Sequence, residues 1–127
     1  MVEKFQWINN VYVWDMDCWS CKRETTVLQN SSEYFWGDRR EGITTLGNLP
    51  NEKLIEIADK FKIPYKIEKK VFFCICIWCD MTQGTYYLNN AIVDNLILDG
   101  WIEKNQVYSK KGRKPAKLKN LKPPINS

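Results

Sequence analysis

Histidine is absent from this chain of 127 residues. Its absence excludes every site that needs an imidazole, including Ser-His-Asp triads, Cys-His pairs and histidine-containing metal sites. Long apolar runs are also missing: the longest, residues 71–78, has the length of a β-strand and falls well short of the roughly 18 residues of a membrane span. The amino terminus carries no apolar segment typical of a secretory signal. We therefore expect a cytoplasmic protein that does not enter the membrane.

Acidic residues are missing from the last part of the chain, which is rich in basic ones. Residues 109–127 contain seven Lys and Arg residues and no Asp or Glu. The rest of the chain has 12 basic and 15 acidic residues, a net charge of −3, so the overall charge of +4 conceals an acidic body with a basic tail. The tail has three prolines and little apolar material, and we expect it to be disordered. The predicted organisation is one domain over residues 1–108 and a basic tail over residues 109–127.

Four of the five cysteines form two Cys-x-x-Cys motifs. In a reducing cytosol such pairs indicate metal or thiol redox chemistry rather than disulfides. Zn²⁺ prefers four tetrahedral ligands and binds thiolates well, so two such turns can supply a complete structural site. The 54 residues between the motifs form a long connection, but each doubling of a loop costs only about 0.6 kcal/mol in closure entropy. We therefore predict a structural Zn²⁺ bound by Cys18, Cys21, Cys76 and Cys79.

The cysteine pairs also allow a core role or a redox role. Free cysteines are common core residues, and Cys-x-x-Cys is also the motif of thiol redox centres that begin a helix. Neither pair precedes a convincing helix, which favours the metal. Lys22 and Arg23, directly after Cys21, offset the negative charge of a zinc–thiolate site but are also typical neighbours of a reactive thiol. The fifth cysteine, Cys74, shares a strand face with Cys76. We expect a buried core thiol; the alternatives are a place near the metal or the replacement of one ligand.

Each cysteine motif lies between two runs of β-prone residues. The segments that lead into and include the motifs cover residues 11–21 and 71–79, and the runs after them cover residues 25–29 and 84–88. We interpret both segments as strand, turn, strand. The intervening insertion, residues 30–70, begins with a stretch rich in turn-forming residues up to Pro50, which we assign to a loop, with a short strand within it as the alternative.

Helical periodicity predicts two helices. The first follows Pro50, is capped by Asn51 and is stopped by Pro64. The second starts near Asn89 or Asn90 and ends at Gly100, before a short strand over residues 102–108. Their apolar positions are Leu54, Ile55, Ala58 and Phe61 in the first helix, and Ile92, Val93, Leu96 and Ile97 in the second. The predicted fold is α+β: a small antiparallel β-ribbon that binds zinc, with one helix inserted between the two cysteine turns and one after the second.

The residues around the two motifs are similar to zinc-ribbon domains. The similar segments are Asp17-Cys-Trp-Ser-Cys-Lys-Arg-Glu-Thr25, with the two residues after it, and Cys76-Ile-Trp-Cys-Asp-Met-Thr-Gln-Gly-Thr-Tyr-Tyr-Leu88, together about a fifth of the chain. They resemble a pattern of uncharacterised bacterial and phage proteins, in which a first knuckle and strand are paired with a distant Cys-x-x-Cys and a Gln-Gly-aromatic turn. Family knuckles often carry Gly after the second cysteine, where this chain has Lys22 and Asp80. The resemblance implies a zinc-stabilised β-ribbon with a split Cys₄ site.

The basic tail predicts contact with nucleic acid, because Lys and Arg neutralise phosphates and release counterions. Residues 111–115, Lys-Gly-Arg-Lys-Pro, are weakly similar to the AT-hook, whose Arg-Gly-Arg-Pro core places an Arg in a narrow minor groove. The candidate nucleic-acid-binding residues are Lys22, Arg23, Lys110, Lys111, Arg113, Lys114, Lys117 and Lys119. The alternative is a solvated tail that only aids solubility.

Three hypotheses of function follow, and all include the metal. The first is a structural zinc module that binds DNA or RNA through Trp19, Trp78, the cations beside them and the tail. The second is a small protein-interaction factor, for example a phage or mobile-element inhibitor of a host nucleic-acid enzyme, because six Trp and six Tyr suit an aromatic interface. The third is a metal-dependent nuclease that uses Asp15 and Asp17, which share a strand face. Phosphate-binding glycine loops and nucleophile motifs are missing, so we expect neither catalysis nor a small-molecule substrate.

Overall fold

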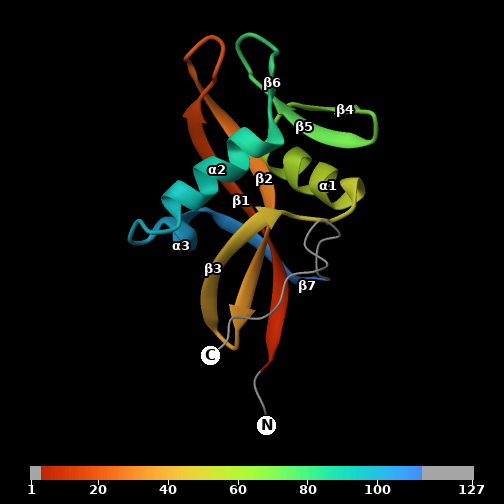
Figure 1. Ribbon diagram of the computed structural model, residues 1–127. Helices are drawn as coiled ribbons and strands as arrows, with labels where there is room; N and C mark the ends of the chain where they lie inside the picture. Colours follow the sequence, from red (N-terminus) through yellow and green to blue (C-terminus); the bar gives the residue numbers. More distant parts are fainter. Residues whose placement is uncertain (1–3, 113–127) are drawn as a thin grey trace.

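Two antiparallel sheets and three helices make up residues 4–112, the part of the chain that the computed structural model describes (Figure 1). The larger sheet has the strand order β3-β2-β1-β7, and the smaller one has the order β4-β5-β6. The elements are β1 (Phe5–Asp17), β2 (Glu24–Trp36), β3 (Arg39–Leu46), α1 (Asn51–Phe61), β4 (Tyr65–Glu68), β5 (Val71–Ile75), β6 (Thr82–Gln83), α2 (Thr85–Asn95), α3 (Trp101–Asn105) and β7 (Gln106–Gly112). The predicted α+β class with antiparallel strands is confirmed, with three helices in place of two. No helix within these residues is long and apolar enough to cross a membrane.

The long hairpin of β1 and β2 is the central element of the fold. The two strands pair over 13 residues each, from Asp17 and Glu24 beside the first cysteine turn to Phe5 and Trp36 at the far end. The prediction of a loop with at most a short strand after residue 30 is therefore wrong in extent, because β2 continues to Trp36 and β3 follows it. The sequence obscured β2 because its central residues are polar, whereas in the structure they are buried within the sheet.

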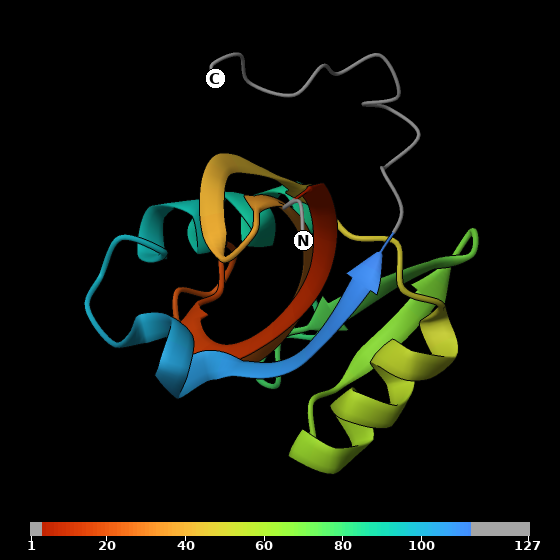
Figure 2. The same cartoon turned by 90° about the horizontal axis from the view of Figure 1, so that it is seen from below.

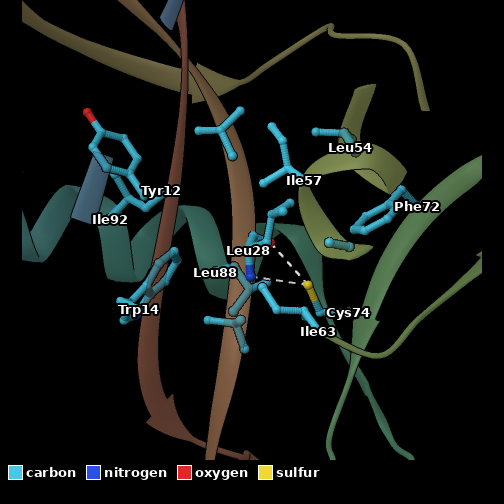
Figure 3. Close-up of a cluster of buried hydrophobic side chains, with 13 residues drawn as sticks. Tyr12, Trp14, Leu28, Leu54, Ile57, Ile63, Phe72, Cys74, Leu88 and Ile92 are labelled. Atoms are coloured by element: carbon cyan, nitrogen blue, oxygen red, sulfur yellow. Dashed lines mark hydrogen bonds between the residues drawn. The ribbon is translucent and has the colours of Figure 1, made fainter. Parts of the chain in front are cut away.

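Both faces of the larger sheet are covered. Figure 2 shows this sheet strongly curved, with α2 on one side and with α1 and the β4–β5 hairpin on the other. Figure 3 shows Tyr12 and Trp14 on the side of α2, where the ring centroid of Trp101 lies 5.1 Å and 5.6 Å from theirs. On the opposite side Leu28 meets α1 and β5, and its backbone N–H and C=O both hydrogen-bond the Cys74 thiol at 3.2 Å. The core thus extends through the sheet and joins all the layers.

Helix α1 has the predicted extent but not the predicted cap. Pro50 occupies the N-cap position, and the Asn51 side chain instead donates to the Lys70 carbonyl at 3.0 Å. The buried residues of the helix are Leu54, Ile57 and Ala58. Asn51 therefore connects the start of α1 to the β4–β5 turn, a contact that local sequence cannot indicate because its partner is 19 residues away.

Helix α2 begins at Thr85, four residues before the earliest predicted start, so the prediction of a strand over residues 84–88 is wrong. Gly84 is extended and precedes the helix, and Leu88 and Ile92, one turn apart, are both fully buried. Burial of this pair outweighs the β-propensity of the Thr-Tyr-Tyr run. The predicted apolar face is only partly correct, because Val93 and Ile97 remain 44% and 84% exposed.

The end of the described chain departs from prediction at two points. Gly100 has the positive φ expected, 79°, but it precedes the short helix α3, and the strand predicted over residues 102–108 is β7, over Gln106–Gly112. Ser109–Gly112 therefore belong to the sheet, where they pair with Trp7–Asn10 of β1, and the prediction of a disordered tail is wrong for these four residues. The free edge of β1 provides backbone hydrogen bonds whatever the side chains are. The rest of the predicted tail lies outside the described residues.

A fully buried carboxylate lies in the larger sheet, away from the cysteines. Glu33 accepts hydrogen bonds from the hydroxyls of Tyr12 and Ser31 at 2.8 and 2.6 Å, and pairs with the guanidinium of Arg40 at 2.6 Å. Burial and the charge of Glu33 both raise the pKa of Tyr12, which keeps its hydroxyl a donor. The carboxylate is thus satisfied only while Arg40 neutralises its charge.

We expect Arg40→Ala to lower the free energy of unfolding by about 3 kcal/mol, because it leaves a buried charge without its partner. Urea denaturation at neutral pH measures this change. Arg39→Ala is the matched control, since the exposed Arg39 pairs with Glu41 at the surface and should cost no more than about 0.5 kcal/mol. Equal effects of the two substitutions would contradict the interpretation.

Candidate metal centre

Four thiols from two distant segments converge at one end of the β1–β2 hairpin. Cys18 and Cys21 lie in the turn between β1 and β2, which we call the first knuckle (18–21), and Cys76 and Cys79 lie in the turn between β5 and β6, the second knuckle (76–79). The two turns lie next to each other at the top of Figure 1. All four Sγ atoms are within 4.8 Å of one another.

The separations between the sulfurs fit a tetrahedral metal site. The Sγ atoms of Cys18 and Cys79 are 3.6 Å apart, and those of Cys21 and Cys76 are 3.7 Å apart. Sulfurs bound at about 2.3 Å around a tetrahedral Zn²⁺ lie about 3.8 Å from one another, whereas a disulfide needs about 2.05 Å. The four cysteines are free thiols and lie close enough to hold a metal ion.

The two knuckles share the same backbone conformation. In the first, the Lys22 N–H donates to the Cys18 carbonyl at 3.0 Å; in the second, the Asp80 N–H donates to the Cys76 carbonyl at 3.0 Å. Lys22 and Asp80 have φ angles of 66° and 62°, in the left-handed region that favours glycine. These are the two positions after the second cysteine where glycine is common in zinc-ribbon knuckles. This chain therefore forms the turn with residues that are strained there by roughly 1 kcal/mol each.

Several N–H groups donate to the sulfurs of Cys18 and Cys76, the two buried cysteines of the four. The backbone N–H groups of Ser20 and Trp78 donate to the sulfurs of Cys18 and Cys76, each at 3.3 Å. The side-chain amide of Gln83 donates to Cys18 at 3.4 Å, and Gln83 is fully buried. Such donors stabilise thiolate and orient metal ligands. Sequence patterns did not identify Gln83 as a site residue; its only signal was its place in the Gln-Gly turn four residues after Cys79.

The thiols differ in acidity because they share hydrogen bonds. Burial raises the pKa of Cys18, but backbone N–H groups of its own knuckle and the Gln83 amide lower it, and the pKa falls to about 6. The Met81 backbone lowers the pKa of Cys79, but burial and hydrogen bonds with the other three thiols raise it to about 11. One thiolate is thus favoured without a cation, and a bound metal would have to displace the protons of the others.

Each knuckle has one tryptophan, whose indole N–H forms a hydrogen bond with the backbone just after the opposite knuckle. The indole N–H of Trp19, in the first knuckle, donates to the Thr82 carbonyl at 2.7 Å, and that of Trp78, in the second, donates to the Glu24 carbonyl at 3.0 Å. The guanidinium of Arg23 lies 5.2 Å from the centre of the Trp78 ring. These contacts fix both rings while leaving them 44% and 58% exposed.

Cys74 lies in the hydrophobic core and outside the group of four thiols. Its thiol forms a hydrogen bond with the backbone of Leu28, and burial raises the pKa of the thiol to about 12. The hydrogen bond from the Leu28 backbone lowers this pKa, but burial outweighs it and disfavours the thiolate form that binds metals.

The predicted nucleic-acid-binding residues are divided between two regions. Lys22 and Arg23 adjoin the knuckles, where the Lys22 ammonium donates to the Trp19 carbonyl at 2.7 Å. Lys110 and Lys111 are exposed on β7, opposite Asn9 and Ile8 of β1. The eight residues from Asn9 to the end of β1 span about 26 Å, so these two pairs of cations are not brought together. Arg113, Lys114, Lys117 and Lys119 lie outside the described residues.

The two candidate catalytic acids do not gather further ligands. Asp15 accepts a hydrogen bond from the Thr26 hydroxyl, and both Asp15 and Asp17 are exposed. Over residues 4–112, the four cysteines are the one group of three or more thiol or carboxylate side chains close enough to hold a metal ion. In this part of the chain, therefore, no cluster of carboxylates supports the nuclease hypothesis.

Comparisons with protein families, with curated proteins and with solved structures find no match for this chain.

We expect Cys18→Ser and Cys79→Ser to lose the metal and to unfold or aggregate, because removal of one of four ligands should abolish most of the binding free energy. Cys74→Ser should keep the metal and remain folded, since its hydroxyl can replace both hydrogen bonds to Leu28. Elemental analysis and circular dichroism of the three purified variants test this. Metal loss in Cys74→Ser equal to that in the other two would contradict the ligand assignment.

We expect Gln83→Leu to weaken metal binding by about 10- to 100-fold while the fold is retained, because the substitution removes a donor to the Cys18 sulfur without removing a ligand. Competition with a chromogenic chelator measures the affinity. Asn90→Ala, at an exposed position of α2, is the control. An unchanged affinity in Gln83→Leu would show that this hydrogen bond does not tune the site.

Proposed function

We propose that this protein is a structural zinc-binding domain of the zinc-ribbon type, in which Cys18, Cys21, Cys76 and Cys79 bind one Zn²⁺. The observation that carries the proposal is the convergence of four thiols within 4.8 Å. A set of four sulfur ligands in tetrahedral arrangement is typical of zinc or iron–sulfur chemistry, and a closed four-ligand site is typical of a structural zinc. The resemblance of both knuckles to zinc ribbons supports zinc.

The role of the metal follows from what it would connect. The first knuckle ends the β1–β2 hairpin, and the second joins β5 to β6 in the smaller sheet. Zinc coordination would therefore bind the smaller sheet to the larger one at a second point, beyond the contact between Cys74 and Leu28. The ion would also hold the tryptophan rings of both knuckles in fixed positions, and catalysis is not part of the proposal.

The side chains displayed around the zinc support contact with another protein. Trp19, Ile77, Trp78 and Met81 are 44%, 62%, 58% and 40% exposed and form what we call the knuckle surface. Rigid aromatic and aliphatic side chains of this kind serve as anchors in protein interfaces. Clusters of exposed apolar side chains often mark interaction sites.

Charge favours protein over nucleic acid at this surface. The cations Lys22 and Arg23 are balanced by Glu24 and Asp80, all four exposed, so the knuckles carry no net positive charge. Phosphate contact depends on an excess of cations. The nucleic-acid alternative is supported instead by Lys110 and Lys111, exposed at the edge of the larger sheet and followed in sequence by further basic residues.

Elemental analysis of protein purified without chelator tests the zinc proposal. We expect one zinc per chain, released in step with modification of four thiols and accompanied by loss of structure. Iron, with its visible absorption, would contradict zinc. Protein without metal whose thiols cycle to disulfides would overturn the structural site and favour redox chemistry.

Salt dependence separates the two classes of partner. If nucleic acid is the partner, a labelled 20-nucleotide DNA or RNA should bind the full chain with an affinity that falls steeply with salt and drops in Lys110→Gln/Lys111→Gln. Neutralisation is preferable to deletion from residue 109, which would remove part of β7. Our proposal of a protein partner expects no such binding and predicts that Trp78→Ala leaves the zinc content nearly unchanged, although the loss of the hydrogen bond to the Glu24 carbonyl lowers thermal stability. Salt-sensitive binding abolished by Trp78→Ala would overturn it.

A further inference from the structure

A cleft of about 550 Å³ lies beside β1, on the edge where β7 stops pairing. Strand β7 pairs with β1 only over Trp7–Tyr12, although β1 continues to Asp17. The remaining part of this edge, residues 13–17, therefore has no neighbouring strand among residues 4–112. Side chains from β1, β2, α2 and α3 line the cleft.

The register of the sheet shows which backbone groups face the open edge. The backbone N–H and C=O of Leu28 form hydrogen bonds with the Cys74 thiol, so they point away from β1. Val13, which lies opposite Leu28, must then point its own peptide groups away from β2, and Asp15, two residues further, does the same. The Asp17 carbonyl on this edge accepts a hydrogen bond from the Tyr87 hydroxyl, in agreement with this alternation. The peptide groups of Asp15 are thus placed to pair with an added strand.

The cleft combines aromatic walls with an excess of acidic groups. Trp14 and Trp101 line it with their rings edge to face, and the indole N–H of the buried Trp14 has no hydrogen-bond partner. Among the lining residues, Asp15 and Glu24 are acidic and Lys104 is basic. Residues 80–103, which include α2 and the start of α3, contain four acidic residues and no Lys or Arg. The local field therefore attracts cations and repels phosphates.

We propose that this cleft binds an extended, basic peptide segment of a partner protein. The segment adds to the open edge of β1 as an antiparallel or parallel strand and places a Lys or Arg side chain against the carboxylates of Asp15 and Glu24. Main-chain pairing supplies affinity and the acidic cleft supplies selectivity, as is general for strand addition. The site is separate from the knuckle surface, since Trp19, Ile77, Trp78 and Met81 do not line it. It therefore extends the proposed function with a second contact of defined chemistry.

The probe for the test is a fluorescein-labelled heptapeptide of alternating valine and arginine, added to the zinc-loaded full chain. Two matched peptides accompany it: one with glutamate in place of arginine, and one with every peptide nitrogen methylated, which keeps the charge but has no N–H group to donate to a neighbouring strand. Fluorescence anisotropy at fixed salt gives the affinities. We expect the arginine peptide to bind at least about tenfold more tightly than either matched peptide.

Protein variants locate the binding. Asp15→Asn/Glu24→Gln should weaken binding of the arginine peptide by about tenfold, whereas Glu52→Gln/Asp59→Asn, with the same charge change at exposed positions of α1, and Ile77→Ala on the knuckle surface should not. Equal binding of the methylated peptide would show simple charge attraction and overturn the proposal. Equal effects of the two double variants, loss of binding in Ile77→Ala, or no binding at about 1 mM peptide would overturn it as well.

Discussion

The convergence of four thiols on one point is the constraint on which the rest of the structure depends. The two knuckles are separated by 54 residues, so the intervening chain must leave the end of the β1–β2 hairpin and return to it. Strand β3, helix α1 and strand β4 carry the chain along the larger sheet, and β5 brings it back. The core positions this returning strand as well. Cys74 on β5, two residues before Cys76, donates a hydrogen bond to the backbone of Leu28 on β2. The knuckles then meet through their sulfurs and through the reciprocal indole hydrogen bonds of Trp19 and Trp78.

The molecule has different chemistry at its two ends. At the knuckle end lie the thiols, the exposed apolar side chains of the knuckle surface and the acidic cleft beside β1. Towards the other end lie the buried pair of Glu33 and Arg40 and the exposed Lys110 and Lys111 of β7. The net charge of +4 describes neither end. An acidic, aromatic end favours a basic protein segment, whereas the basic end is where contact with an anionic polymer would occur.

The candidate metal ligands were predictable because their signal is local. A Cys-x-x-Cys turn directs two sulfurs to one side through its own backbone, and the two turns need only be brought together. The surroundings of the sulfurs were not predictable. Gln83 becomes a donor to Cys18 because β6 pairs with β5. Lys22 and Asp80 occupy left-handed conformations, for which lysine gives no signal and aspartate only a weak one. The separation of Lys110 from the knuckle cations likewise depends on the register of β7 with β1.

By itself the sequence determined the α+β class, the limits of α1, the places of the knuckles and the charge asymmetry, because these follow from spacing, periodicity and composition along short stretches of chain. Only the tertiary structure decided that the polar run after residue 30 is a buried strand, that residues 85–88 are helical, and that Ser109–Gly112 join the sheet. In each case the stabilising contact comes from outside the segment itself: Tyr12 on β1 for Glu33, the buried core beneath Leu88, and the open edge of β1 for β7. Local propensities of a few tenths of a kcal/mol per residue cannot compete with such contacts.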